Sequence, residues 1–484
     1  MSDTLKKKAT SAFLWDFLGL VANQGTTFIV SIFLARLLDP KDFGVLGMMT
    51  ILVSTFQSLT YLGFGESIIQ KKESTELQLS TMFYLNILIG IVLCSITFFF
   101  SETIAGFYAE SQIILPLKAL SLCFIFLSVN LIQKALLTKK LAFKSITKAS
   151  IYSGIISGIV GIVLAFSGYG LWSLVVKTIL NMFLNSVLIW WYSNWKPKLL
   201  FSLNSIKEHW AFGKNMYLST IIYTIFNQID GFFIAKMAGS LQLGLYFRAK
   251  SLNQLLVKYS SESLGKIMLP VFSTVQDDKV RLKEIMSKTL HVTSFFVFGL
   301  VAYLYLEGED IIVLLFGVKW LSTITFFNIM IFYSYSYPIN HIFGNLIQSI
   351  GESAAYLRLE IIKKSMVLIA ILIGVYYGIF AFLWSMFFIT ILQMWINMLY
   401  VQIKLKFEMK HYVVLIFKYL IISCLPIFLL FYLKEYLHWR RIHECLLFTF
   451  LFVFLYLSLS RLFKSEGLIF IKNLINERFI RKKV

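Results

Sequence analysis

Several basic residues stand inside segments that are otherwise apolar, where a charge needs a functional or structural reason. Arg248, Lys258, Glu262 and Lys266 fall within about 80° of one another on a helical wheel. A charge at the centre of a spanning helix costs about 2.5–3.5 kcal/mol when it faces lipid. We therefore expect this face to line a polar, cationic cavity that holds an anionic substrate. In the alternative, Arg248 and Lys266 extend to the two membrane interfaces and Lys258 pairs locally with Glu262.

Lys177 is a second intramembrane cation, inside the segment LWSLVVKTILNMFLN at 171–185. The segment LWSMFFITILQMWIN at 383–397 matches it at eight of fifteen positions and has Ile389 in place of Lys177. Because the second copy accepts an apolar residue, the lysine is expected to contact substrate or to form an ion pair. A structural bond to a neighbouring helix is the alternative. Arg36 completes the predicted set of substrate-binding cations.

Acidic and amide residues form two further groups on apolar helices. Asp16 and Asn23 share one face, and Asn227 and Asp230 share another with Tyr223. Together with Glu262 they are candidates for coupling to a cation or for pairing with the basic residues when substrate is absent. Ordinary polar contacts between helices, worth about 0.6 kcal/mol each, are the alternative. We predict no catalytic residues and no metal site, because the cysteines and histidines are scattered singly.

The elements that carry these residues are membrane helices. Hydrophobic residues make up 58% of the chain, charged residues 14%, and the mean hydropathy is +0.76. These values lie outside the range of soluble domains. Apolar runs long enough to cross a bilayer, roughly 20 residues each, recur along the whole length. We expect an all-α, multi-pass membrane protein whose first apolar stretch is an uncleaved span.

The net charge of +20 reflects membrane orientation rather than nucleic-acid binding. Thirty of the 45 basic residues fall at the termini and in alternate loops, and positive charge stays on the cytoplasmic side. This pattern predicts about fourteen spans with both termini in the cytoplasm. It assigns Arg358, Lys363 and Lys364 to a cytoplasmic loop after the tenth span. Residues 306–320 and the region of Lys434 are assigned to outward loops.

A second internal match supports a duplication. FLARLLDPKDFGVLGMMTIL at 33–52 aligns with FIAKMAGSLQLGLYFRAKSL at 233–252, at an offset of 200 that pairs Arg36 with Lys236. Each repeat contains six spans, so both enter the membrane in the same sense, and the two are related by an axis along the membrane normal. We expect an N-lobe at 1–200, a C-lobe at 201–411, and two additional helices with a basic tail at 412–484.

The segments ARLLDPKDFGVLGM, ALLTKKLAFKSI and NQIDGFFIAKMAGSLQLGLYFRAKSL resemble Wzx-type flippases of the multidrug/oligosaccharidyl-lipid/polysaccharide superfamily. The likeness is closest to the branch that exports colanic or teichuronic acid units. It implies a V-shaped pair of six-helix lobes, with spans 1 and 7 lining the central cavity. It also implies movement of an undecaprenyl-pyrophosphate-linked oligosaccharide to the outer leaflet of the bacterial cytoplasmic membrane, for O-antigen, capsule or exopolysaccharide assembly.

The resemblance predicts a transporter without a bound cofactor that acts by alternating access, and it leaves coupling to Na⁺ or H⁺ open. The expected partners are the lipid-linked oligosaccharide, membrane lipids and a polysaccharide polymerase with other export machinery, and we expect a monomer. A cation-coupled drug antiporter of the same superfamily is the first alternative, which should have fewer cavity cations and more acids. A membrane-embedded polymerase or ligase is the second, which should carry a large outward loop with catalytic residues.

Overall fold

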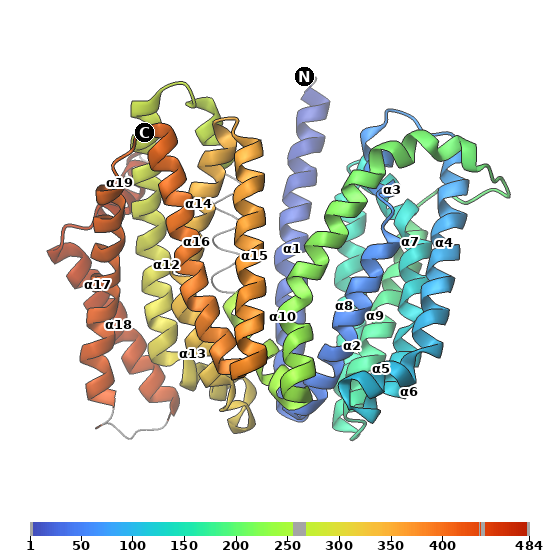
Figure 1. Cartoon of the computed structure of the whole chain (residues 1–484), viewed down its shortest axis with the longest axis horizontal. Coiled ribbons are helices and arrows are strands. Elements are labelled where there is room, and N and C mark those ends of the chain that lie inside the picture. Colours follow the sequence, from blue (N-terminus) through green and yellow to red (C-terminus); the bar gives the residue numbers. More distant parts are fainter. Residues whose placement is uncertain (1–2, 255–267, 435, 437–440, 482–484) are drawn as a thin grey trace. The chain divides into compact units, whose positions relative to one another are not determined.

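The computed structural model describes residues 3–254, 268–434, 436 and 441–481, and the regular elements in these ranges are all helices. The chain divides into two compact units, Met1–Gly244 and Leu245–Val484. The first unit contains α1 (Asp3–Leu37), α2 (Pro40–Thr60), α3 (Phe64–Gln70), α4 (Glu76–Phe99), α5 (Ser101–Tyr108), η1 (Ser111–Ile113), α6 (Ile114–Leu120), α7 (Leu122–Lys139), α8 (Phe143–Phe166), α9 (Leu171–Tyr192) and η2 (Leu203–Ile206) (Figure 1).

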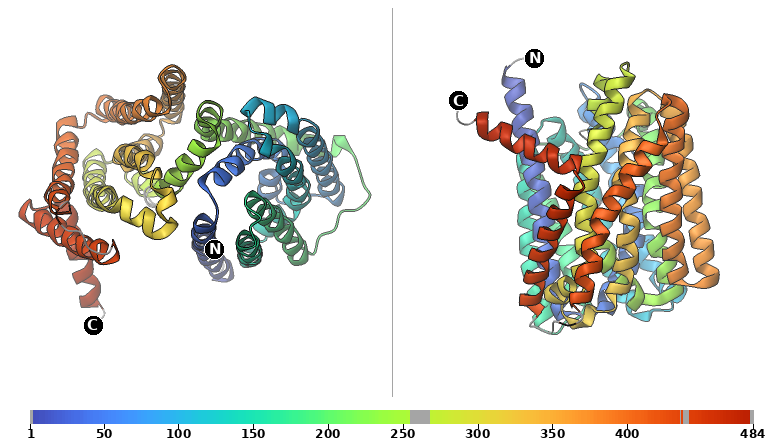
Figure 2. Two further views of the ribbon diagram at one scale, coloured as in Figure 1. Left: turned by 90° about the horizontal axis from the view of Figure 1, so that it is seen from below. Right: turned by 90° about the vertical axis from the view of Figure 1, so that its left-hand side faces the viewer.

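The long helix α10 (Lys207–Asn253) passes from the first unit into the second. The second unit continues with α12 (Lys279–Phe316), η4 (Val318–Trp320), α13 (Thr323–Ser334), α14 (Ser336–Ser349), α15 (Ser353–Tyr377), α16 (Ile379–Leu405), α17 (Met409–Lys434), α18 (Arg441–Leu462) and α19 (Glu466–Arg481). In the left panel of Figure 2 most helices of each unit are seen close to end-on, so they run roughly parallel within their unit. Helices satisfy every backbone polar group internally, as a membrane requires.

Eleven helices in the described residues are long and apolar enough to cross a membrane, so this is a multi-pass membrane protein. Three further helices differ from that pattern for visible reasons. Helices α13 and α14 are separate and too short to cross singly, and α15 has four charged residues between 358 and 364. Residues 255–267, where we expected the rest of span 8, lie outside the described residues. The count of fourteen therefore stays a prediction.

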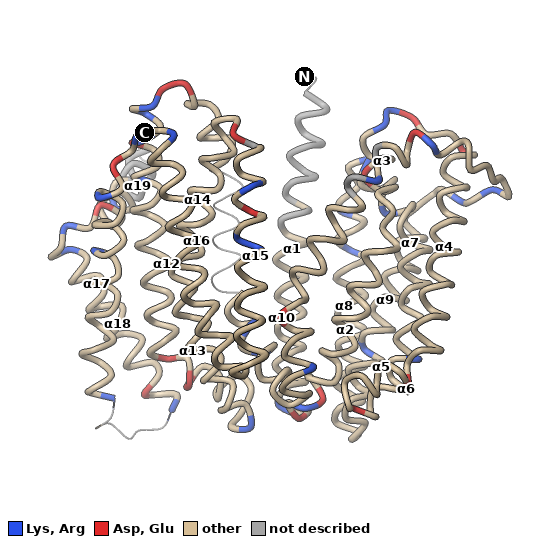
Figure 3. Tube along the Cα trace, viewed as in Figure 1, with Lys and Arg blue, Asp and Glu red and all other residues tan. Residues whose placement is uncertain are grey.

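Helix α15 corrects the assignment of three basic residues. Arg358, Lys363 and Lys364 were expected in a cytoplasmic loop, yet α15 begins at Ser353 and continues through all of them. The physical reason is that the turn before α15 is very short, with Gly351 in the left-handed conformation at φ 82°. The helix therefore starts before the charges rather than after them, and Figure 3 shows acidic and basic positions along α15.

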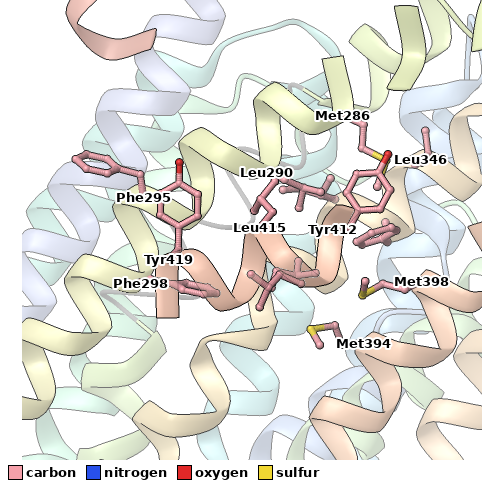
Figure 4. Close-up of a cluster of buried hydrophobic side chains, with 14 of the residues drawn as sticks. Met286, Leu290, Phe295, Phe298, Leu346, Met394, Met398, Tyr412, Leu415 and Tyr419 are labelled. Carbon is pink, nitrogen blue, oxygen red and sulfur yellow. The ribbon is translucent and has the colours of Figure 1, made fainter. Parts of the chain in front are cut away.

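The core of the second unit forms around α12. Side chains of α12 such as Met286, Leu290 and Phe298 face Tyr412 and Tyr419 of α17, and α14 and α16 contribute to the same cluster (Figure 4). These residues are buried. Lipid tails are as apolar as these side chains, so close packing rather than water exclusion holds such helices together.

The two segments aligned at an offset of 200 break their helices at corresponding positions. Helix α1 ends at Leu37, and Asp39 in an extended conformation begins α2, with Pro40 at its first position. Two hundred residues later the chain of α10 kinks at Gly239, whose backbone has φ 80° and ψ −177°. The offset of 200 pairs residue 39 with residue 239, so the alignment of the sequences matches the breaks in the helices.

Repeat-equivalent residues also contact one another at this corner of the first unit. A Cβ atom added to Gly44 would overlap the carbonyl oxygen of Ser240, and one added to Gly244 would overlap that of Pro40. Each of these added atoms would also lie 3.0 Å from the backbone nitrogen of the other glycine. The contact is reciprocal, with 40 paired to 244 and 240 paired to 44, which is the signature of a local two-fold axis. A duplication predicts such an axis.

Candidate functional site

Helix α8 packs against both α1 and α9, and small residues on α8 let both neighbours approach closely. A Cβ atom added to Gly158 would come within 2.5 Å of Val30 on α1. One added to Gly161 would come within 2.9 Å of the Cβ of Lys177 on α9. Small residues of this kind are typical of helix interfaces in membranes, where they allow backbones to approach.

A row of amide and hydroxyl groups follows the α8–α9 interface. Asn181 donates from Nδ2 to Ser157 Oγ at 3.2 Å, and Asn185 donates from Nδ2 to Ser153 Oγ at 3.5 Å. Asn130 of α7 donates to Asn185 Oδ1 at 3.3 Å. The donors on α9 are four residues apart, as are the acceptors on the antiparallel α8, so the row is a consequence of helix periodicity.

Lys177 extends this row toward the N-terminal end of α9, which begins at Leu171. It precedes Asn181 by four residues and therefore lies on the same face of α9. Its side chain is half-buried, and its aliphatic stem packs on Gly161. Lys177 lies about 9 Å along the axis from the start of α9, which puts a cation beside a polar seam and well inside a spanning helix.

A pair of asparagines also joins two helices of the second unit. Asn397, which aligns with Asn185 at an offset of 212, donates from Nδ2 to Asn340 Oδ1 on α14 at 3.1 Å. Gln393, which aligns with Asn181, donates to the backbone oxygen of Lys363 on α15 at 3.0 Å. The shared amides thus make interhelical bonds in both units. Ile389 occupies the position of Lys177.

Helix α15 carries the charges that sequence reasoning missed. Lys363 forms an ion pair with Glu360, and its side chain is 12% exposed. Its ammonium also lies 5.8 Å from the ring centroid of Tyr356. With Arg358 and Lys364 the segment has three cations and one acid, and Lys363 lies about 15 Å along the helix from its start. The signal in the sequence was the short turn before Ser353, which leaves no loop for these charges.

Arg248 is buried inside the second unit, with 6% of its surface exposed. Its guanidinium lies 4.5 Å from the ring centroid of Phe316 and 4.7 Å from that of Trp320. Both aromatic side chains are fully buried, and a guanidinium between two rings is held by cation–π attraction. This placement favours a structural role for Arg248 over contact with substrate.

The other members of the predicted basic face fall in a part of the chain that the structure does not describe. Lys258, Glu262 and Lys266 lie outside the described residues, as does the side chain of Asp16. Asn23 is exposed on α1. The expectation that Arg248 shares a cavity face with these lysines therefore stays a prediction.

Asn227 and Asp230 are both half-buried on α10. Asp230 accepts a hydrogen bond at Oδ1 from the backbone nitrogen of Gly231 at 2.8 Å, and Tyr223 on the same helix is 62% exposed. The three positions share a face as predicted from their spacing. They form a polar patch on the helix that opens the second repeat.

Arg36 and its repeat equivalent Lys236 lie close to the two helix breaks. Arg36 is exposed in the last turn of α1, where a cation interacts favourably with the helix dipole. Lys236 lies 4.3 Å from the ring centroid of Phe107 and donates to its backbone oxygen. Nearby, Ser240 donates to Glu110 Oε2 at 2.7 Å and Lys41 approaches the same oxygen at 3.5 Å. These polar contacts surround the Gly44–Gly244 contact.

Comparison with known proteins identifies the family. The model of a family described as polysaccharide biosynthesis protein matches residues 33–325. The chain belongs to this family. The match begins at the first repeat alignment and contains Lys177, the Gly44–Gly244 contact and Arg248. The three segments that carried the predicted resemblance all lie inside the matched range.

Individual relatives agree with that assignment. The lipopolysaccharide biosynthesis protein WzxC of Escherichia coli K12 is 25% identical over 377 residues, which are 77% of this chain and 76% of that protein. The teichuronic acid biosynthesis protein TuaB of Bacillus subtilis is 26% identical over 275 residues, or 56% of each chain. The succinoglycan biosynthesis transport protein ExoT of Rhizobium meliloti is 22% identical and covers 66% of this chain and 65% of its own length.

Solved structures show the fold. The lipid II flippase MurJ in an inward closed conformation is 16% identical, has a TM-score of 0.72, and covers 96% of this chain and 100% of its own. The MATE multidrug transporter DinF-BH has a TM-score of 0.52 at 14% identity, over 82% of this chain and 95% of its own. The chain thus has the fold of the superfamily that was predicted from the sequence.

Proposed function

We propose that this protein moves a lipid-linked oligosaccharide from the inner to the outer leaflet of the bacterial cytoplasmic membrane, for assembly of a surface polysaccharide. The family match over residues 33–325 is the observation that carries the proposal. The relatives named above act in the synthesis or transport of polysaccharides, and the fold is shared with a lipid II flippase. The drug transporter DinF-BH shares the fold less closely, with its lower TM-score, so the antiporter is the weaker alternative, and a polymerase or ligase is weaker still.

The headgroup of such a substrate requires cations inside the membrane. A sugar-linked pyrophosphate cannot enter hydrocarbon without partners for its charges and hydroxyls. Lys177 is half-buried beside the amide and hydroxyl groups of the α8–α9 seam. An ammonium suits the phosphate, and amides and hydroxyls suit the sugar. Lys177 is therefore our first candidate for contact with the headgroup.

The α15 cations form a second candidate group. Lys363 is paired with Glu360, whereas the segment as a whole carries an excess of two positive charges. We propose that an arriving pyrophosphate competes with Glu360 for Lys363, and that Arg358 and Lys364 contribute to the attraction. Such an exchange would keep Lys363 paired while no substrate is bound. Lys258, Glu262, Lys266, Asp16, Asn23, Asn227, Asp230 and Arg36 remain proposed members of the polar pathway.

The membrane potential supplies a driving force for export. A pyrophosphate diester carries roughly two negative charges, and each is worth about 2.3 kcal/mol per 100 mV. With the inside negative, outward movement of the headgroup is favourable by about 4–5 kcal/mol per 100 mV. Nucleotide hydrolysis is not required, and coupling to Na⁺ or H⁺ would add to this force.

Alternating access follows from the proposed duplication. Two lobes related by an axis along the membrane normal can rock against each other around a fixed substrate site. We propose that the Gly44–Gly244 contact is the pivot, because its reciprocal geometry marks a local two-fold axis where the chain leaves the first unit. The proposed orientation has both termini in the cytoplasm, and we expect a monomer that works beside a polysaccharide polymerase.

Complementation of a flippase-deletion strain tests the function and the site together. Loss of a charged hydrogen bond costs about 1.5–3 kcal/mol, so Lys177→Ala should lower export by about 10- to 100-fold. Lys177→Arg should retain part of it, and the exposed Lys140→Ala serves as the control. The readouts are surface glycan, accumulated lipid-linked precursor and membrane insertion. Full export by Lys177→Ala would remove Lys177 from the site. Failure of the wild type with every lipid-linked glycan tried would refute the function.

A further inference from the structure

A buried acidic pair with a single lysine lies at one end of the second unit. Glu307 and Asp310 are one turn apart on α12, and Lys434 is the last residue of α17. Lys434 donates from Nζ to Glu307 Oε1 at 3.0 Å and lies 2.6 Å from Asp310 Oδ2. The Glu307 side chain is fully buried, and that of Asp310 is 9% exposed. The sequence had placed all three in outward loops, so this is a correction: α12 continues to Phe316.

Among the described residues, the charges of this cluster do not balance. Two carboxylates and one ammonium leave a net charge of −1 in a buried space, which is unfavourable without a further positive charge. The missing positive charge is most evident at Glu307 Oε2. This oxygen is buried and has no hydrogen-bond partner among the described residues. A bare carboxylate oxygen is far more costly there than a neutral acid group.

The neighbouring side chains do not supply the missing charge. From α12, Tyr303 forms a hydrogen bond of 2.9 Å between its hydroxyl and that of Thr449. From α18, the thiol of Cys445 hydrogen-bonds to the Glu307 carboxyl, but a neutral thiol adds no positive charge. The ring of Phe448 lies 5.6 Å from Lys434 Nζ. In the described part of the chain Lys434 is therefore the single cation that pairs with the two acids.

A metal ion fits this space poorly. Hard cations take six or more oxygen ligands, and the ammonium of Lys434 already occupies the position between the two carboxyl groups. A proton needs only one oxygen. Glu307 Oε2 is available for it, while Oε1 can go on accepting from Lys434 as a carbonyl oxygen and Asp310 can stay ionised.

We propose that Glu307 is a proton-binding site: one proton adds to Oε2, the carboxylate becomes a neutral acid, and the remaining Asp310–Lys434 pair is balanced. The site joins α12 to the helix pair α17 and α18, which we predict to be additional to the two repeats. The charge pattern predicts that this end faces the outside, so the proton would come from there. Use of this proton in transport rests on the proposed function, whereas its binding does not.

Infrared difference spectroscopy of the full-length protein in lipid nanodiscs tests proton binding. At neutral pH we expect a carbonyl band of a protonated carboxylic acid that disappears in Glu307→Gln. Glu309→Gln is the matched control, because Glu309 is exposed two residues away on the same helix. The band should persist in this control. Absence of the band in the wild type, or its persistence in Glu307→Gln, would overturn the proposal.

Thermal unfolding gives a second, independent readout. Glutamine mimics a protonated glutamate, so Glu307→Gln should unfold within a few degrees of the wild type. Asp310→Asn should unfold at a clearly lower temperature, because it leaves Lys434 without an ionised partner. The reverse order would assign the proton to Asp310 and refute the proposal. If these results hold and export by Glu307→Gln is normal at every external pH, the site binds a proton that transport does not use.

Discussion

Substitution of Gly44 by alanine is the most direct test of the corner that we propose as the pivot. The added methyl group would overlap the carbonyl oxygen of Ser240, so α2 and α10 must separate locally. Because Gly244 faces Pro40 in the reciprocal way, Gly244→Ala should have the same effect. Gly65→Ala is the matched control, since Gly65 is also in a helix and an added Cβ there meets nothing within 4 Å.

The expected change in the free energy of unfolding has two opposing contributions. Alanine in place of glycine within a helix stabilises by up to about 1 kcal/mol, and Gly65→Ala should show this gain alone. Overpacking costs about 1–3 kcal/mol, so Gly44→Ala should be less stable than Gly65→Ala by roughly 1–3 kcal/mol. One separation of the helices relieves both clashes. The double variant Gly44→Ala/Gly244→Ala should therefore be little worse than either single variant, a departure from additivity typical of residues in contact.

The assay combines unfolding of the purified protein in detergent with surface glycan in a flippase-deletion strain. A pivot predicts that Gly44→Ala and Gly244→Ala lose export in similar proportion, at temperatures where both variants are still folded. Equal stability and export for Gly44→Ala and Gly65→Ala would show that the close approach of these glycines is unimportant. Strict additivity of the two clashes would show that they are separate contacts, without the reciprocal geometry of a two-fold axis.

Three further predictions concern single contacts. His209 lies outside the span that begins at Tyr217, and burial, with Lys71 nearby, lowers its pKa from 6.5 to about 4. Because the folded state disfavours the charged form of His209, the stability of the protein should be full above pH 6.5 and fall by up to roughly 3 kcal/mol as the pH drops to 4. His209→Gln, measured by thermal unfolding against pH, should lose this dependence. Glu360→Gln should strengthen substrate binding by releasing Lys363, whereas Lys363→Met should weaken it at least tenfold. The measurement is the affinity of a lipid pyrophosphate for the purified protein. Equal affinity in both variants would contradict the proposed competition between pyrophosphate and Glu360 for Lys363. Asn185→Ala and Asn397→Ala should each lower the unfolding temperature to a similar degree, because they break equivalent bonds, and a large difference between them would argue against a shared scaffold.

The sequence predicted the features that depend on local periodicity. The all-helical membrane fold follows from composition, and the aligned asparagines make equivalent bonds in both units. Apolar helices and their faces are properties of short stretches of chain, which is why they could be predicted.

Features that depend on distant partners could not be read in this way. Lys434 pairs with Glu307, which lies 127 residues away in the sequence. Arg248 contacts the rings of Phe316 and Trp320, which lie on other elements. Charges at the ends of apolar runs look like loop residues when their partners are unknown. The same error placed Lys363 in a loop, although a turn of few residues leads directly into α15. Burial of a charge is decided by its partner, which periodicity does not reveal.

The division between shared and unshared residues is informative about function. In the proposed duplication, contacts retained in both halves are those that the common fold requires. Asn185 and Asn397 are of this kind, since each bonds an asparagine on the equivalent neighbouring helix. Lys177 aligns with Ile389, and at the same offset of 212 the cations Arg358, Lys363 and Lys364 of α15 align with Ile146, Ile151 and Tyr152 of α8. We therefore expect the cations found in one half alone to serve transport, and the export assay of Lys177→Ala and Lys363→Met tests this.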